Sequence, residues 1–112
     1  MEDRRVFDRI KAKFPIRFLD INSGREGRAE TMDISANGLG LVTQGNLPVN
    51  TPLEIWLDIP DHHAPLYTYG KVVWSQGVAD TNVQRVGVCL KKEELIGLAR
   101  VLWVREKNKI YP

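Results

Sequence analysis

Apolar and polar residues alternate most clearly between residues 52 and 59. An extended chain would carry large aliphatic side chains on one face there, namely Leu53, Ile55, Leu57 and Ile59. Because successive side chains of a strand point to opposite faces, this pattern predicts a strand with one buried face. Similar short runs, bounded by turn-forming residues, occupy residues 15–21, 28–34, 38–43, 66–75 and 84–91. Six short strands are therefore expected between residues 15 and 91.

The spacing of apolar residues changes after residue 91. There they recur every three or four positions, at Leu95, Leu98, Ala99 and Leu102. This spacing predicts a helix over residues 92–105 whose apolar stripe packs against the sheet. Short strands followed by one late helix in 112 residues favour a fold dominated by β-structure, a closed antiparallel barrel with a C-terminal helix. Closure is favoured because it removes the exposed edges of a small sheet.

Residues 1–14 fit neither period, and we interpret them as a basic N-terminal arm outside a barrel domain of residues 15–106. Residues 1–17 carry six Lys or Arg against three Asp or Glu, whereas the whole chain has a formal net charge of only +2. A basic segment of this size suits a small anionic ligand better than DNA or RNA, which needs an extended track of phosphate contacts. The start at Met1 and the short C-terminal tail slightly favour a free-standing domain.

Composition narrows the class of protein. With 43% hydrophobic and 27% charged residues, the chain is expected to fold as one globular domain. It has neither the apolar run of about 20 residues that a membrane helix needs nor the apolar stretch of a signal peptide. We therefore expect a cytoplasmic protein without membrane insertion. No pattern of a catalytic site is found, and His62 and His63 are interpreted as part of a surface loop rather than as metal ligands.

Three further residues are interpreted as structural. The single cysteine, Cys89, lies in a predicted strand and is expected to be a buried thiol in a reducing compartment. Trp56 and Trp103 are expected to serve in packing.

Two short motifs carry the candidate chemistry. The first, Arg-x-x-x-Arg, lies in the arm and consists of Arg5 and Arg9. The second, Asp-x-Ser-x-x-Gly, lies at a predicted strand–turn–strand junction and consists of Asp33, Ser35 and Gly38. Taken singly, the first would be a solvated charged segment and the second a serine-stabilised turn.

Together and in this order, the two motifs resemble those of the PilZ family, whose members bind the bacterial second messenger cyclic di-GMP. The resemblance covers roughly residues 4–104, including residues 38–41, 70–74, 85–88 and the late helix. It implies a six-stranded split barrel of the PilZ type with a C-terminal helix. It also implies a nucleotide-binding receptor for signal transduction rather than an enzyme.

The resemblance implies a cyclic di-GMP site built from both motifs. A guanidinium of the arm can donate two hydrogen bonds to guanine O6 and N7 or pair with a phosphate. The carboxylate of Asp33 complements the N1–H and N2–H donors of guanine, which adenine does not present in that arrangement. Ser35 would contact the ligand or hold the turn, and Gly38 would allow close approach of the backbone or adopt a positive φ. Residues expected near the ligand with less support are Asn37, which would complete the turn, and Trp74, Arg85 and Gly87.

The arm indicates how binding would produce a signal. A polar segment has little apolar surface to bury, so Arg5 and Arg9 are expected to become ordered on the barrel when the ligand binds. The resemblance also implies that an arginine directly before the first motif, here Arg4, accompanies binding of an intercalated cyclic di-GMP dimer. The ordered arm would then contact a downstream protein partner that the sequence does not identify.

Two alternatives remain open at this point. A PilZ-like barrel can act as a protein-interaction scaffold that binds no nucleotide, although such members usually lack the arginines or the Asp-x-Ser pattern. A small barrel can also bind single-stranded RNA, which would need a basic groove with exposed aromatic side chains on its strands. In this chain the basic excess lies in the arm instead.

Overall fold

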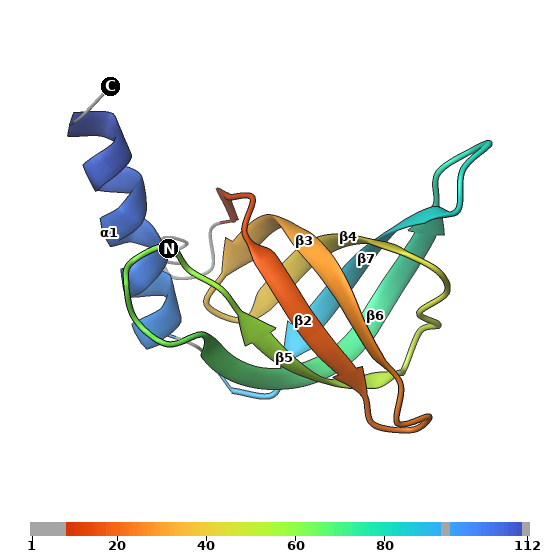
Figure 1. The fold of residues 1–112 in the computed structure, drawn as a ribbon. Helices are drawn as coiled ribbons and strands as arrows, with labels where there is room; N and C mark the ends of the chain where they lie inside the picture. Colours follow the sequence, from red (N-terminus) through yellow and green to blue (C-terminus); the bar gives the residue numbers. More distant parts are fainter. Residues whose placement is uncertain (1–8, 93–94, 111–112) are drawn as a thin grey trace, which may run out of the picture.

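A computed structural model describes residues 9–92 and 95–110 of the chain. The described part is a β-barrel with a helix at one end (Figure 1). Its elements in chain order are β1 (Ile10–Lys11), β2 (Pro15–Asp20), β3 (Glu26–Ser35), β4 (Gly38–Gln44), β5 (Pro52–Leu57), β6 (Leu66–Gly77), β7 (Val83–Leu90) and α1 (Leu95–Ile110).

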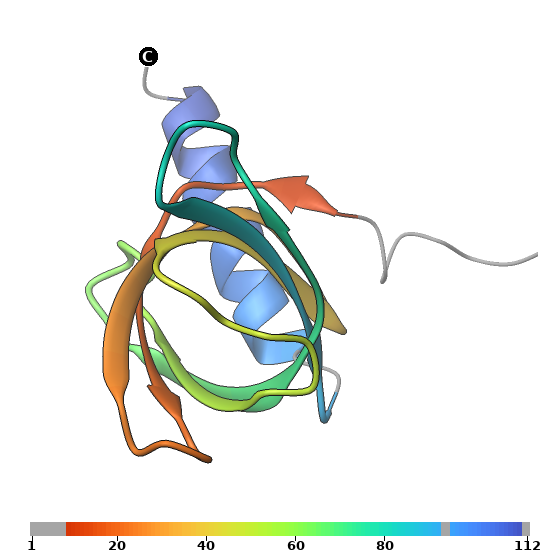
Figure 2. The same cartoon turned by 90° about the vertical axis from the view of Figure 1, so that its right-hand side faces the viewer.

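Six strands of the described chain close into an antiparallel barrel. Neighbouring strands follow the order β3-β2-β5-β6-β7-β4, and β4 pairs back onto β3 to complete the ring. Figure 2 looks into this ring from the end opposite the helix. The predicted six-stranded barrel with a C-terminal helix is confirmed. The extra strand β1 pairs with β3, so Ile10 and Lys11, which we placed in the arm, are attached to the barrel.

The alternation of side chains explains how the barrel is filled. Leu53, Ile55 and Leu57 on β5 are at most 2% exposed, whereas the residues between them lie half-buried on the outer surface. The same alternation on β7 buries Val86 and Val88. Each such side chain contributes about 1.5–3 kcal/mol by removing apolar surface from water. The interior is therefore a packed core, and any ligand surface lies on the outer walls or at the ends.

The helix α1 closes one end of the barrel with a different face from the predicted one. Leu98, Val101 and Val104 are buried there. Ala99 and Leu102 are exposed, Leu102 by 42%, so the predicted stripe is wrong for these two residues. The side chain of Leu95, its fourth member, lies outside the described part of the structure.

A partly buried ion pair is consistent with this choice of helix face. Arg100 donates from Nε to Asp61 Oδ2 at 2.6 Å and from Nη2 to Asp61 Oδ1 at 2.7 Å. It also donates to the carbonyl oxygen of Ala64 at 2.9 Å. The Asp61 side chain is only 4% exposed, and the hydrogen bonds from Arg100 hold the pKa of its carboxyl well below the usual value. With Arg100 held on the loop between β5 and β6, the neighbouring face with Leu98, Val101 and Val104 meets the barrel.

Two expectations about single residues are wrong. Cys89 is exposed, because the side chains of Val86, Val88 and Leu90 point into the barrel and Cys89 alternates with them. Trp103 is 50% exposed on the outer side of α1 rather than packed in the core. Trp56 does pack, but on the outer surface, where the Arg17 guanidinium carbon lies 4.9 Å from its ring centroid. His62 and His63 are exposed, as expected for a surface loop.

Candidate functional site

The second motif forms the tight turn between β3 and β4. Ser35 pairs with Gly38, and Ala36 and Asn37 connect the two strands. The hydroxyl of Ser35 lies 2.9 Å from Asn37 Oδ1 and 3.4 Å from the Gly38 carbonyl oxygen, and it can donate to either. Ser35 is only 2% exposed, so of its two expected roles the structure supports that of holding the turn. The carbonyl oxygen of Asn37 accepts a hydrogen bond from the Leu90 amide at 2.9 Å, which ties the turn to β7.

Gly38 is needed for close approach rather than for an unusual backbone conformation. Neither Asn37 nor Gly38 has a positive φ, so of the two roles expected for Gly38 the structure does not show the positive φ. A Cβ at position 38 would lie 3.0 Å from the Val88 carbonyl oxygen and 3.5 Å from Nη2 of Arg9. The tight contact is the one with the Val88 backbone, so the absence of a side chain at Gly38 lets β4 approach β7 closely, while Arg9 lies at ordinary van der Waals distance beside the turn.

Arg9 and Asp33 meet in an ion pair. Arg9 Nη1 lies 2.5 Å from Asp33 Oδ1, with 48% of the arginine side chain and 29% of the aspartate side chain exposed. Asp33 follows an irregularity in the pairing of β3 with β4, between Thr31 and Asp33. Thus the structure brings together one residue from each of the two motifs.

Thr31 fixes the chain between β1 and β2, so that β1 stays beside Asp33. Its hydroxyl accepts a hydrogen bond from the Phe14 amide at 2.8 Å and donates one to the Ala12 carbonyl oxygen at 2.5 Å. Its own amide donates to the Phe14 carbonyl oxygen at 2.9 Å. Lys11 then lies directly opposite Asp33 in the strand register.

One row of paired residues crosses the outer wall from β3 to β6. Asp33 pairs with Gly40, Gly40 with Gly87, and Gly87 with Trp74. The carboxylate lies over Gly40, since a Cβ there would come within 2.6 Å of Asp33 Oδ1. The indole of Trp74 lies over Gly87 in the same way. The two glycines therefore form a low floor between an acidic and an aromatic side chain.

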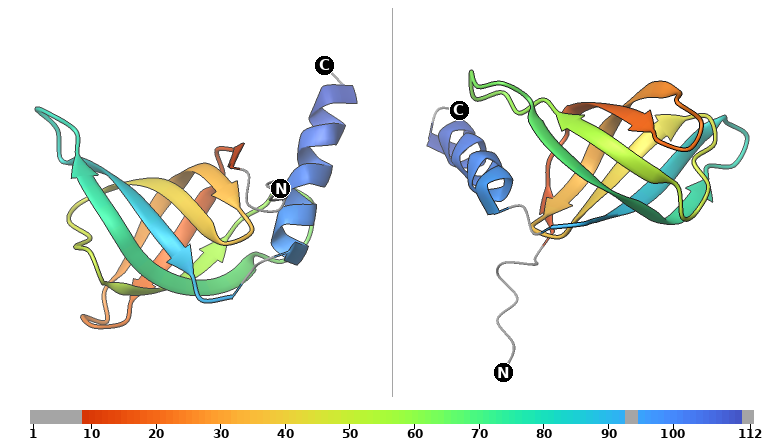
Figure 3. Two further views of the ribbon diagram at one scale, coloured as in Figure 1. Left: turned by 180° about the vertical axis from the view of Figure 1, so that it is seen from behind. Right: turned by 90° about the horizontal axis from the view of Figure 1, so that it is seen from below.

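This floor adjoins an open groove of about 680 Å³ on the outer wall. β6 and β7 of this wall are seen from outside in the left panel of Figure 3. Basic side chains border the groove on both sides, Lys11 and Lys13 beside β3 and Arg85 on β7. The remaining lining residues are Ala12, Met32, Asp33, Trp74 and Gln76. Its size lies within the roughly 300–1,000 Å³ usual for small-molecule sites.

The structure thus gathers most of the expected site on one wall. Arg9, Asp33, Ser35, Asn37 and Gly38 cluster at the β3–β4 turn, while Trp74, Arg85 and Gly87 lie on β6 and β7. Trp74 is 41% exposed, so it does not belong to the core. Arg4 and Arg5 lie outside the described residues.

Sequence reasoning missed three contributors to this wall. Gly40 was noticed only as part of a family-like segment, and its role depends on being paired with Asp33. Lys11 and Lys13 were counted only as charges of the arm, although both line the groove. A glycine two residues after Gly38 on the same strand face was the one signal available in the sequence.

Comparisons with known proteins identify the family and the fold of the chain. Residues 3–102 match the PilZ domain family. Among solved structures, the chain is similar to the PilZ domain with c-di-GMP of YcgR from Escherichia coli, at a TM-score of 0.72 and 13% identity, covering 96% of this chain and 95% of that one. It is also similar to the Bacillus subtilis inhibitor of motility MotI/DgrA, at a TM-score of 0.73 and 14% identity. A third similar structure is the Borreliella burgdorferi PlzA protein in complex with c-di-GMP, at a TM-score of 0.58 and 12% identity.

These similarities have a defined reach. The match to MotI/DgrA covers 100% of this chain and 55% of that one. The match to PlzA covers 94% of this chain and 53% of that one. At these identities the solved structures establish the fold alone, and a comparison with curated protein sequences gives no match. Within the described residues, no helix is long and apolar enough to cross a membrane. The same residues contain no group of three or more His, Cys, Asp or Glu arranged to hold a metal ion.

Proposed function

Because the chain belongs to the PilZ domain family, as its two motifs indicated, we propose that it is a bacterial receptor for cyclic di-GMP and not an enzyme. The ligand would lie in the groove between the arm and the outer wall of β3, β4, β7 and β6. One observation carries this proposal: the row in which Asp33 lies over Gly40 and Trp74 over Gly87, with Arg9 at its acidic end. That row combines a carboxylate, a flat ring and a guanidinium within one open groove.

Each of these groups has a defined task toward a guanine nucleotide. Asp33 accepts hydrogen bonds from guanine N1–H and N2–H, whose donor pattern adenine does not share. Trp74 offers an exposed indole on which a base stacks, an interaction of about 1–3 kcal/mol for each base. The guanidinium of Arg9 donates to guanine O6 and N7 or to a phosphate. Lys11, Lys13 and Arg85 supply positive charge for the two phosphates.

The Arg9–Asp33 ion pair gives the proposed binding step a specific form. Arg9 and Asp33, which would both bind the ligand, are paired with each other in the structure. In the proposed step, guanine replaces Arg9 at the Asp33 carboxylate. Arg9 then turns to the ligand and draws the preceding segment of the arm with it. The end of the arm next to the barrel is therefore attached before the ligand binds, through β1 and this ion pair. The proposed signal is the transfer of Arg9 from Asp33 to the ligand, rather than the first attachment of the arm to the barrel.

Arg4 and Arg5 complete the proposal as expectations from the motif. Arg5 provides a second guanidinium, and Arg4 favours an intercalated dimer of cyclic di-GMP. The ordered arm would present a new surface to a cytoplasmic protein partner. Calorimetry on the wild type and Arg4→Leu measures the stoichiometry, for which two ligands per wild-type chain and one per variant are expected.

Calorimetric titration with cyclic di-GMP, cyclic di-AMP, GTP and a short RNA tests the central proposal. Only cyclic di-GMP is expected to bind tightly. Arg9→Ala should weaken it by about 10- to 150-fold, the equivalent of a hydrogen bond to a charged group at roughly 1.5–3 kcal/mol. Arg25→Ala is the matched control, because Arg25 is exposed on the β2–β3 turn and does not line this groove. If the wild type binds none of these ligands, the protein-interaction scaffold is favoured. If RNA binds as tightly as cyclic di-GMP, a barrel that binds single-stranded RNA is favoured.

A further inference from the structure

A second row of side chains crosses the opposite wall of the barrel. Arg28 on β3 pairs with Arg17 on β2, Arg17 with Trp56 on β5, and Trp56 with Tyr67 on β6. Residues paired across antiparallel strands share a face, so two arginines and two aromatic side chains stand in one line on the outer surface. None of these residues belongs to the cyclic di-GMP groove.

The two arginines of this row lie opposite each other on β2 and β3, and the exposed Glu26 and Glu30 flank Arg28 on the same face of β3. Like charges directly opposite each other in a sheet are destabilising. Within residues 9–92 and 95–110, neither Arg17 nor Arg28 has a carboxylate at ion-pair distance. The Arg17 guanidinium lies over the ring of Trp56, and both arginines are exposed. Two exposed, planar guanidinium groups side by side, neither at ion-pair distance from a carboxylate of the described residues, are suited to an anion with several oxygens.

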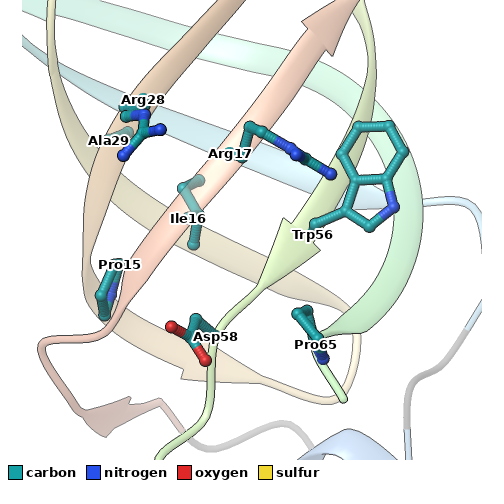
Figure 4. Close-up of a pocket in the computed structure, with 8 residues that line it drawn as sticks. All are labelled: Pro15, Ile16, Arg17, Arg28, Ala29, Trp56, Asp58 and Pro65. Carbon is teal, nitrogen blue, oxygen red and sulfur yellow. The ribbon is translucent and has the colours of Figure 1, made fainter.

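A cavity of about 430 Å³ lies beside these arginines (Figure 4). Arg17, Arg28 and Trp56 line one part of it, and Asp58 lies at the other end between Pro15 and Pro65. The Asp58 amide donates to the Pro15 carbonyl oxygen at 3.0 Å, which fixes this end of the cavity. The volume falls within the roughly 300–1,000 Å³ of small-molecule sites. One end of the cavity is therefore basic and aromatic, and the other is acidic.

We propose that this cavity binds a nucleoside monophosphate at a site separate from the cyclic di-GMP groove. The phosphate pairs with the guanidinium groups of Arg17 and Arg28. The base lies along the apolar wall beside Trp56, and its amino group donates to the Asp58 carboxylate. A purely anionic ligand would be repelled by Asp58, whereas a base with an amino group complements it. The proposal does not rest on the receptor function.

Two-dimensional nuclear magnetic resonance with ¹⁵N-labelled protein tests this, using AMP and inorganic phosphate as probes. AMP is chosen because adenine lacks the donor pattern that Asp33 would recognise in the other groove. Saturable shifts of the Trp56 indole N–H, assigned with Trp56→Phe, are expected with AMP, and weaker binding is expected with phosphate. Arg28→Gln should weaken AMP about tenfold or more, because it removes a charge-assisted contact.

Control variants locate the site. Within the described residues the exposed side chain of Arg28 makes no hydrogen bond or ion pair, so Arg28→Gln is expected to fold normally. Arg25→Gln and Arg9→Ala should leave AMP binding unchanged. The proposal is overturned if AMP produces no saturable shift at Trp56, if Arg28→Gln binds AMP like the wild type, or if phosphate binds as tightly as AMP. Loss of AMP binding in Arg9→Ala would also overturn it, by placing AMP in the other groove.

Discussion

Replacing Gly40 by alanine tests whether Asp33 forms hydrogen bonds to the guanine of the ligand. The new Cβ would lie 2.6 Å from Asp33 Oδ1, closer than such atoms approach, and 3.1 Å from its Cγ, a tight contact. We therefore expect the Asp33 carboxylate to shift away from its position over Gly40. This side chain is partly exposed, so it can move into solvent, and we expect the free energy of unfolding to change by no more than about 1 kcal/mol.

The effect on ligand binding should be much larger than the effect on stability. A hydrogen bond to a charged group contributes roughly 1.5–3 kcal/mol. Loss of the Asp33 contact should therefore weaken the binding of cyclic di-GMP by about 10- to 150-fold, as measured by calorimetry. Gly77→Ala is the matched control, because a Cβ at Gly77 meets nothing within 4 Å. It should bind like the wild type.

A double variant separates the loss of Asp33 from other effects of the new methyl group. If Gly40→Ala acts through Asp33, it should add little to Asp33→Ala, since interacting positions are not additive. Wild-type affinity in Gly40→Ala would refute the reasoning, and so would full additivity of the two substitutions. A loss of stability far above 1 kcal/mol would show that the methyl group disturbs the barrel itself.

Three further predictions concern the fold. The pKa of Asp61 lies below its ordinary value of 3.8 in the folded state, so the pair with Arg100 stabilises the fold above that pH and is lost as pH falls through the folded-state pKa. Urea unfolding should show wild type more stable than Arg100→Met at pH 7, with a smaller difference at acidic pH; a constant difference would contradict this. Leu41 is 0% exposed, so Leu41→Ala should lower the free energy of unfolding in urea by about 2–5 kcal/mol. Val73 is 50% exposed, and Val73→Ala should change that free energy by no more than about 0.5 kcal/mol. Cys89 should react with a thiol reagent in native protein, and cyclic di-GMP should slow that reaction because Cys89 pairs with Gly38; a thiol that reacts only after unfolding would contradict its exposure.

The barrel could be predicted from the sequence because its information is local. A period of two in β5 depends only on which side of one strand faces the core, and burial of Leu53, Ile55 and Leu57 follows. The buried face of α1 could not be predicted in this way. It accompanies the contact of Arg100 with Asp61, which is 39 residues away in the chain.

The site was predicted in its parts but not in its arrangement. The motif identified Asp33 and Gly38, whereas the function of Gly40 appears only when three strands are placed in register. For Cys89 the alternation with Val86 and Val88 already indicated an outward side chain. We gave more weight to the usual burial of cysteine, and this preference was the weaker signal.

The exposed pair of Arg9 and Asp33 has a consequence for the concentration at which the proposed receptor responds. An ion pair at this exposure contributes about 0.2–1 kcal/mol. A ligand that must open this pair binds with an affinity reduced in proportion to the fraction of molecules that are already open, which lowers it by about 2.4- to 6-fold. Such a pair does not block the site. It sets a threshold that one substitution at either residue, or a change in salt concentration, can move by a small factor.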